Sequence, residues 1–211
     1  MNDLNQRRFA AVQDQLMSFA AADATPVGSF TIEPTYTLIS PIPDSITAKI
    51  KAFSDELQKR FPEQYYYLPE QYHLTVVPVP YTHRLEDVIR VLTPLLKDWK
   101  LPIEVRGFAM NRFQVSAVLY PDEESLLPMR QKLRQALAMP DQDFTEHRSI
   151  WEELMWVNFM RFTSPPSPEL VRMVQAHAND ALGHFTLERI DLYEVSTKTR
   201  DPQSSVYIHT F

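Results

Sequence analysis

The sequence predicts an α+β fold in which a single globular domain contains two similar halves. The first observation is an internal repeat, because the segments that begin at Phe30 and Phe113 fall into register under an offset of 83 residues. The second is the order of patterns in each copy: a strand, a Pro-Asp pair, an amphipathic helix and a second strand. The third is size, since 211 residues with 44% hydrophobic content can bury a sizeable core as one unit.

The first copy is expected to open with a strand over residues 30–40 and to continue into a helix capped by Asp44 or Ser45. The apolar face of this helix follows a helical period and comprises Ile46, Ile50, Phe53, Leu57 and Phe61. A second strand should cover about Tyr72–Val79 and end there, because Pro78 and Pro80 favour a strand end. A further helix contains Pro94, which should kink it or end it early.

The second copy should repeat this order, with a strand over Phe113–Tyr120 and a helix from about Asp122 to Ala138. Its second strand lies in the text MWVNFMRF. A helix is expected from Ser167 to about Leu182, with Gly183 as its C-terminal cap. Further strands are expected at Ile103–Phe108, His184–Ser196 and Ser205–Phe211.

Residues 1–28 are expected to form an N-terminal helix and linker, and residues 29–211 the single domain. The helical stripe within residues 3–20 consists of Phe9, Val12, Leu16 and Phe19. This apolar stripe predicts a helix that packs against one half of the domain. A contact between two copies of the chain is the alternative.

Composition excludes several classes of protein. The chain has no cysteine, so it has no disulfide, thiol nucleophile or zinc-thiolate site. No stretch approaches the roughly 20 apolar residues of a membrane span, and polar Gln13, Asp14 and Gln15 interrupt a would-be signal peptide. We therefore expect a cytoplasmic protein that does not bind a membrane. The sequence leaves the oligomeric state undetermined.

The net charge of −6 and the pI near 5.5 argue against a long nucleic-acid footprint, which needs a basic surface. A nucleotide or a short RNA end remains a possible partner, because a pocket needs only a few donors. The chain has no His-x-x-x-His pair and no acidic loop of ligand spacing, so no metal or cofactor is expected.

The candidate functional residues lie at matching positions of the repeat. On a strand His73 and Thr75 would share one face, where an imidazole and a hydroxyl can transfer a proton and bind a phosphate oxygen. The equivalent residues of the second copy are Trp156 and Asn158. Asn158 can still donate a hydrogen bond, whereas Trp156 cannot transfer a proton.

These residues resemble the motifs of the two-histidine phosphoesterase superfamily, which includes the bacterial RNA ligase-like proteins and cyclic phosphodiesterases. The resemblance covers residues 30–211 and rests on YHLTVVPV, on WVNFMRF, which includes Arg161, and on the C-terminal RIDLYEVS and SVYIHTF. It implies two pseudo-symmetric lobes of antiparallel sheet, with flanking helices, around a central groove. In that family each lobe contributes one His-x-Thr or His-x-Ser motif, so the second motif is degenerate here.

The resemblance implies binding of the 2′,3′-cyclic phosphate of a nucleotide or short RNA end, with His73 and Thr75 as the intact motif. Whether the protein is a hydrolase stays open, because one proton-transfer group is missing; a non-catalytic binder, or a scaffold with Trp156 filling the groove, is the alternative. Arg161 could contact phosphate or form a structural ion pair, and Tyr66 could stack a base or cover the core. Three histidines could replace the missing one: His83, His147 and His209.

Overall fold

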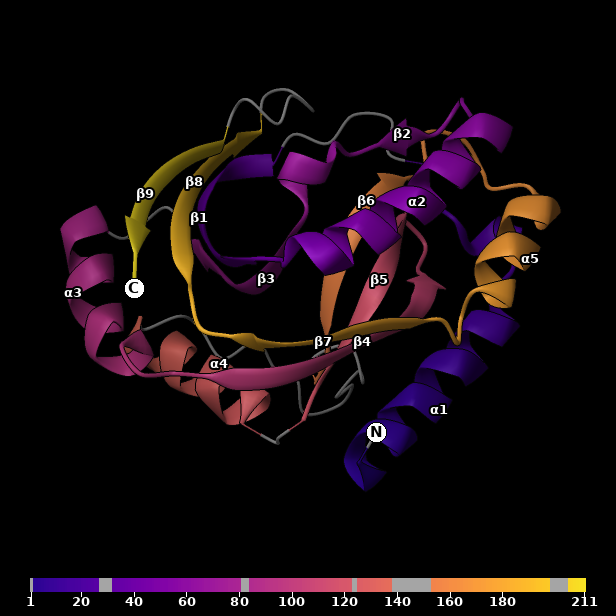
Figure 1. The fold of residues 1–211 in the computed structure, drawn as a ribbon. Coiled ribbons are helices and arrows are strands. Elements are labelled where there is room, and N and C mark those ends of the chain that lie inside the picture. Colours follow the sequence, from indigo (N-terminus) through magenta and orange to yellow (C-terminus); the bar gives the residue numbers. More distant parts are fainter. Residues whose placement is uncertain (1, 27–31, 81–83, 123–124, 138–152, 198–204) are drawn as a thin grey trace.

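The computed structural model describes residues 2–26, 32–80, 84–122, 125–137, 153–197 and 205–211. In these ranges five α-helices and nine strands alternate along the chain (Figure 1). The helices are α1 (Asp3–Ser18), α2 (Asp44–Arg60), α3 (Leu85–Leu96), α4 (Leu126–Ala136) and α5 (Pro168–Ala176). The strands are β1 (Ile32–Pro41), β2 (Tyr65–Tyr66), β3 (His73–Pro80), β4 (Leu101–Met110), β5 (Gln114–Pro121), β6 (Met155–Arg161), β7 (Ala181–Leu187), β8 (Asp191–Thr197) and β9 (Ser205–Thr210).

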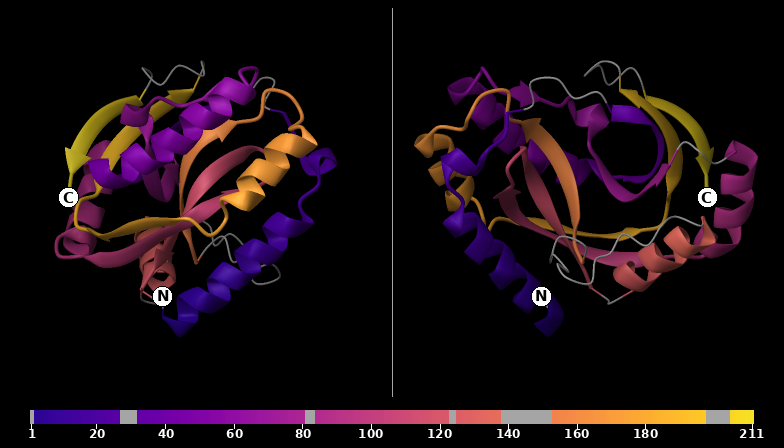
Figure 2. Two further views of the ribbon diagram at one scale, coloured as in Figure 1. Left: turned by 45° about the vertical axis from the view of Figure 1, so that its right-hand side comes forward. Right: turned by 180° about the vertical axis from the view of Figure 1, so that it is seen from behind.

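The strands form one curved sheet with the order β7-β4-β5-β6-β3-β1-β8-β9, and β2 pairs with β6. Every strand pair in the described ranges is antiparallel. Strands β3, β1, β8 and β9 make a first lobe, and β6, β5, β4 and β7 make a second lobe (Figures 1 and 2). The predicted α+β architecture with two lobes is therefore confirmed.

The two lobes meet where β3 and β6 pair, through the single register pair Leu74 and Val157. These two residues occupy equivalent positions of the repeat, because they are separated by the same offset as Phe30 and Phe113. Antiparallel pairing of equivalent residues places an approximate twofold axis between the two strands. The internal duplication is therefore visible as local symmetry at the seam.

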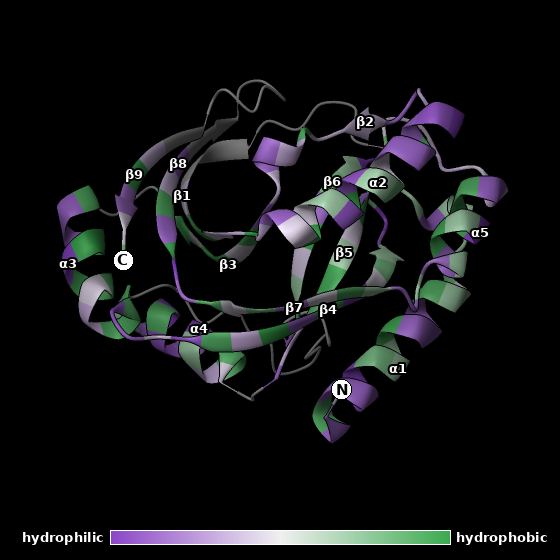
Figure 3. Ribbon diagram, viewed as in Figure 1, coloured by the Kyte–Doolittle hydropathy of each residue, from purple (hydrophilic) through white to green (hydrophobic). Residues whose placement is uncertain are grey.

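Helices α2 and α4 cross from one lobe to the other. The α2 residue Phe53 stacks on Phe108 of β4 at 4.3 Å between ring centroids and meets Phe159 of β6 edge-on at 6.1 Å. Helix α4 lies against β3 of the first lobe and against α3. Figure 3 shows hydrophobic and hydrophilic residues alternating along α1, α3 and α5, as expected for helices with one apolar face.

The bounds of α2, α4 and α5 differ from the prediction, and α4 covers Leu126–Ala136 rather than residues from about Asp122 to Ala138. Ser167 caps α5 as expected, since its side chain accepts a hydrogen bond from the Leu170 amide, but the helix ends at Ala176. Gly183 is not a helix cap: it lies in β7, has a φ of 141° and pairs with Val105. That φ lies in a region that residues with a side chain rarely adopt, which explains the glycine; a Cβ atom there would also lie 2.6 Å from Ile46 Cδ1 of α2. The N-cap of α2 is Pro43, not Asp44 or Ser45, and no side chain caps this helix. Asp44 is instead its first residue.

Helix α1 contacts strands β4 and β5 of the second lobe. Its buried residues include Val12 and Leu16, both members of the stripe predicted from the sequence. None of the helices in the described ranges is long and apolar enough to cross a membrane.

Candidate functional site

The candidate residues of the two motifs lie on one face of the sheet. Leu74 and Val157 are register partners and are both fully buried, so their side chains point to the core face. Because side chains alternate along a strand, the residues on either side of each must point to the opposite face. This opposite face, called the site face below, carries His73, Thr75, Trp156 and Asn158.

His73 is the proton-transfer candidate on this face. Its Nδ1 lies 2.7 Å from the carbonyl oxygen of Gln71, which can accept a hydrogen bond only from a protonated Nδ1. In the neutral ring the lone pair therefore resides on Nε2. The imidazole is exposed, yet crowding by the surrounding protein limits its hydration and lowers the pKa of His73, while the bond to Gln71 opposes part of this shift.

The Asn158 amide is held in one orientation by its neighbours on β5. Its Oδ1 accepts hydrogen bonds from Gln114 Nε2 at 2.6 Å and from Ser116 Oγ at 2.7 Å. Within the described ranges its amide nitrogen has no hydrogen-bond acceptor. Since Asn158 is only half-buried, the nitrogen can serve as a donor to a ligand oxygen.

Thr75 and Trp156 complete the two motif positions. The Thr75 side chain is half-buried, and its hydroxyl has no hydrogen-bond partner among the described residues. Trp156 is also half-buried and packs against a small apolar cluster that includes Val118 and Tyr120 of β5. The indole is thus supported from the second-lobe side and retains an exposed portion.

Arg161 lies at the end of β6, where it is the register partner of Tyr65 and of Gln114. Its guanidinium carbon is 5.7 Å from the centre of the Tyr67 ring, a cation–π distance. Burial raises the pKa of the Tyr67 hydroxyl, and the Arg161 charge opposes part of that rise. No carboxylate in the described part of the chain pairs with Arg161, and its buried Nε has no hydrogen-bond acceptor there.

Tyr66 lies away from the other candidates. It is the register partner of Met160, a fully buried core residue, and its hydroxyl donates to the Phe61 carbonyl oxygen at 3.0 Å. Burial and the nearby Glu63 carboxylate raise its pKa. Its neighbours Tyr65 and Tyr67 contact each other edge-on at 5.1 Å between ring centroids. Of the three consecutive tyrosines at positions 65–67, Tyr65 and Tyr67 therefore lie beside Arg161.

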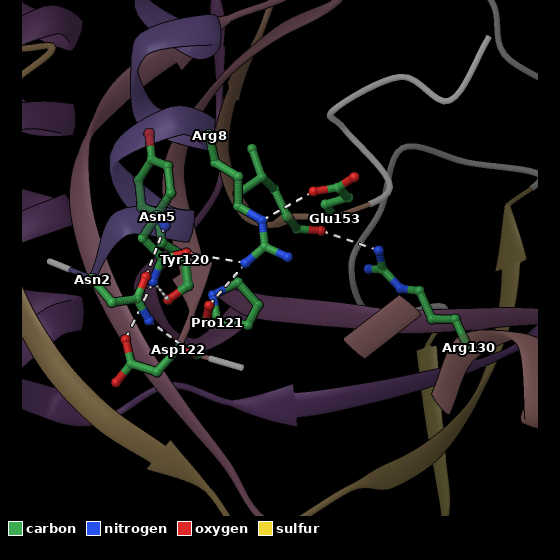
Figure 4. Close-up of polar contacts among 9 residues, drawn as sticks. Asn2, Asn5, Arg8, Tyr120, Pro121, Asp122, Arg130 and Glu153 are labelled. Atoms are coloured by element: carbon green, nitrogen blue, oxygen red, sulfur yellow. Dashed lines mark hydrogen bonds and ion pairs between the residues drawn. The ribbon is translucent and has the colours of Figure 1, made fainter. Parts of the chain in front are cut away.

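Arg130, a residue that the sequence did not single out, joins the two motif strands. It is 8% exposed and donates to three backbone carbonyls, those of Val76 at 2.9 Å, Leu154 at 3.1 Å and Thr75 at 3.3 Å. The Leu154 carbonyl lies just before β6, and the other two lie in β3. Figure 4 shows Arg130 reaching this segment from the side opposite Arg8 of α1. An arginine on an amphipathic helix gives no sequence signal for such a role.

The remaining histidines do not complete a second motif in the described ranges. His209 pairs with the buried Leu192 on β8, so it points to the core face of the first lobe. His177 binds Asp180 at 2.7 Å and follows α5. His184 is on β7, which is separated from β6 by β4 and β5. The other two histidines, at positions 83 and 147, lie outside the described residues.

Metal chemistry was not expected from the sequence. Among the described residues no group of three or more His, Cys, Asp or Glu side chains could hold a metal ion. The site face and the nearby Arg161 instead offer one imidazole, one hydroxyl, one amide and one guanidinium. These are groups that bind phosphate oxygens and can move a proton.

The architecture is the fold of the two-histidine phosphoesterases, with two antiparallel lobes related by a local twofold axis. The solved structure of TT0787 of Thermus thermophilus matches with a TM-score of 0.59 at 15% identity, over 84% of this chain and 96% of that chain. Escherichia coli LigT complexed with 3′-AMP matches with a TM-score of 0.52 at 13% identity, over 84% and 96%. The conserved protein ATU0111 from Agrobacterium tumefaciens str. C58 matches with a TM-score of 0.55 at 12% identity, over 84% and 87%.

Neither a protein-family model nor a curated protein sequence matches the chain. The structural matches agree with the fold that the resemblance implied. At these identities they carry no residue assignment, so the roles of the site-face residues rest on the geometry of this chain.

Proposed function

We propose that the protein binds the 2′,3′-cyclic phosphate of a nucleotide or of a short RNA end on the site face, between β3 and β6. The observation that carries this proposal is the Leu74–Val157 pairing, which brings the two motif positions onto one face around a local twofold axis. Phosphate groups offer several acceptor oxygens, and donors from two sides match them. Structures of LigT with ATP, 3′-AMP and phosphate support a phosphate-containing ligand for this fold.

Each site-face group has a distinct role in this proposal. The Thr75 hydroxyl and the Asn158 amide nitrogen each donate to a non-bridging phosphate oxygen. Arg161 lies further along β6, where it supplies positive charge. Trp156, which retains exposed surface, stacks on the base.

His73 is the single proton-transfer group in this proposal. The Nδ1 bond to Gln71 leaves the Nε2 lone pair available, and a lowered pKa keeps the ring neutral near pH 7. A neutral imidazole can take a proton from the attacking water. No second histidine of the described chain lies opposite it, so the departing oxygen must take its proton from water. Loss of one proton-transfer partner costs about 10²–10⁴ in rate. The proposed activity is therefore binding with slow hydrolysis.

Calorimetry with 2′,3′-cyclic AMP, followed by a turnover assay on the same ligand, tests the proposal. The variant His73→Ala should bind the ligand but release no 2′- or 3′-monophosphate. His184→Ala is the matched control, because His184 is 68% exposed on a distant strand. Equal product from wild type and His73→Ala would exclude the proposed role of His73, and absence of binding by the wild type would refute the proposed function.

A non-catalytic binder is the second candidate. It is favoured by one observation, the tryptophan at the position of the second motif histidine. In that case the wild type binds the cyclic nucleotide and forms no product above the rate without protein. The turnover arm of the same experiment separates the two candidates.

A further inference from the structure

Helix α1 lies on the site face of the second lobe. Val118 is the register partner of Trp156 on β5, so Val118, and Tyr120 two residues on, point to the site face. Both are buried in a small apolar cluster with Val12 of α1, separate from the main core. The α1 residue Phe9 packs against the same cluster, with its ring 5.9 Å from that of Tyr120. Trp156 packs against it too.

The helix is fastened near its N-terminus to the segments that end β5 and begin β6 (Figure 4). The Arg8 side chain is 5% exposed; its Nε lies 3.1 Å from a Glu153 carboxylate oxygen, and its Nη1 donates to the Pro121 carbonyl at 3.0 Å. Asn5 adds bonds to the Tyr120 carbonyl and to Asp122. A largely buried ion pair with further hydrogen bonds fixes the helix in place.

The other half of α1 is fastened to the segment around α5. Gln13 donates to the Ala178 carbonyl at 3.1 Å, and Gln175 donates to the Leu16 carbonyl, also at 3.1 Å. Attachment at both halves makes α1 a fixed part of the second lobe.

The consequence is that the site face is open on β3 and β6 and closed on β5. His73 is exposed and Thr75, Trp156 and Asn158 are half-buried. On β5 the site-face residues from Ser116 onward are buried: Ser116 is 4%, Val118 1% and Tyr120 0% exposed. A ligand seated between β3 and β6 therefore meets α1 and its cluster directly beyond Trp156.

We infer that α1 is a specificity element that limits the ligand, on the second-lobe side, to the terminal nucleotide. This inference rests on the proposed function and adds the size of the substrate to it. The base of the terminal nucleotide stacks on Trp156. A second nucleotide on that side would need the surface of Val118 and Tyr120, which α1 covers.

Detaching α1 without altering the site residues tests the inference. Arg8→Glu places a negative charge against Glu153 and removes the bonds to Glu153 and Pro121. Arg7→Glu is the matched control, because Arg7 is an exposed residue of the same helix and the charge change is identical. The probes are 2′,3′-cyclic AMP and an octaribonucleotide that ends in the same 2′,3′-cyclic adenosine, compared at one salt concentration. Amide exchange of residues 3–18 reports whether α1 has detached, and the milder Arg8→Gln replaces Arg8→Glu if the latter does not fold.

The wild type and Arg7→Glu should bind the two probes with similar affinity. The detached variant should bind the octanucleotide on the order of tenfold tighter, because one more base can stack on the uncovered Tyr120. Its affinity for 2′,3′-cyclic AMP should be unchanged.

Three results would overturn the inference. The first is a wild type that already binds the octanucleotide tenfold more tightly than 2′,3′-cyclic AMP. The second is a variant whose α1 has detached but whose affinity for the octanucleotide has not risen. The third is an equal loss of affinity for both probes when α1 detaches. If the wild type binds neither probe, the proposed function fails and this inference fails with it. Normal binding of 2′,3′-cyclic AMP with no length effect rejects this inference alone.

Discussion

Replacing Arg130 by Met should both destabilise the protein and weaken its site. Within the described ranges the guanidinium donates to carbonyls of β3 and of the residue before β6, at 2.9, 3.1 and 3.3 Å. Each bond to a charged donor contributes about 1.5–3 kcal/mol. Removal of a buried charge also returns its desolvation cost, so the net loss should be about 3–5 kcal/mol. That is a large fraction of the roughly 5–15 kcal/mol typical of globular proteins.

Urea unfolding of the wild type, Arg130→Met and Lys132→Met measures this effect. Lys132 is an exposed residue of the same helix, so its replacement removes the same charge and should change the free energy of unfolding by less than about 0.5 kcal/mol. Arg130→Lys keeps a charge but has fewer fixed donors, so its stability should be intermediate. At a temperature where every variant is folded, binding of 2′,3′-cyclic AMP should fall in the order of lost stability, because the same bonds hold Thr75 and the start of β6.

The reasoning is refuted if Arg130→Met unfolds at the same urea concentration as Lys132→Met. It is refuted in part if stability falls as expected while nucleotide binding is unchanged. In that second case the Leu74–Val157 pair alone is sufficient to align the two strands.

The His73 imidazole should titrate below the ordinary histidine value of 6.5, because the surrounding protein limits its hydration and lowers its pKa. Its contribution to stability is then complete above pH 6.5 and is lost as the pH falls toward the lowered value, which NMR titration and acid unfolding of wild type and His73→Ala would check. Tyr66→Phe should lower the free energy of unfolding by about 1 kcal/mol through loss of its bond to Phe61, and it should leave nucleotide affinity unchanged. Tyr67→Phe should weaken nucleotide binding if Arg161 binds phosphate, so calorimetry in which only Tyr66→Phe weakens binding contradicts the proposed site. Trp156→His should raise turnover of 2′,3′-cyclic AMP by about 10²–10⁴. An unchanged rate would show that the missing histidine at position 156 does not limit turnover.

The elements that the sequence predicted well are those with a strong local pattern. The α2 stripe of apolar residues and the Ser167 cap each depend on neighbouring residues only, and each lies where expected. The site-face grouping was predictable for a different reason, since a duplicated sequence folds into related halves. Period-two alternation then assigned a face to His73 and Thr75.

The features that escaped prediction depend on long-range contacts. Gly183 has the sequence context of a helix cap, but it lies in β7 with a φ of 141° and pairs with Val105 of the distant strand β4. Arg130 looks like an ordinary surface residue of an amphipathic helix, but the crossing of α4 onto the other lobe buries it. The tyrosine run contains no information on which ring faces Arg161, because that depends on the register of β2 against β6.

The tryptophan at the second motif position and the helix at the N-terminus form one structural unit. A histidine at position 156 would place a polar ring against Val118 and Tyr120, whereas the indole extends their apolar cluster toward the site. The cluster in turn is completed by Val12 and Phe9 of α1. The indole thus stabilises the α1 position that closes β5, while Asn158, held by Ser116 and Gln114, still offers a donor beside it. Under the proposed function, the second lobe supplies a closed wall and a stacking surface in place of a proton-transfer group, so nucleotide binding should persist while turnover is slow.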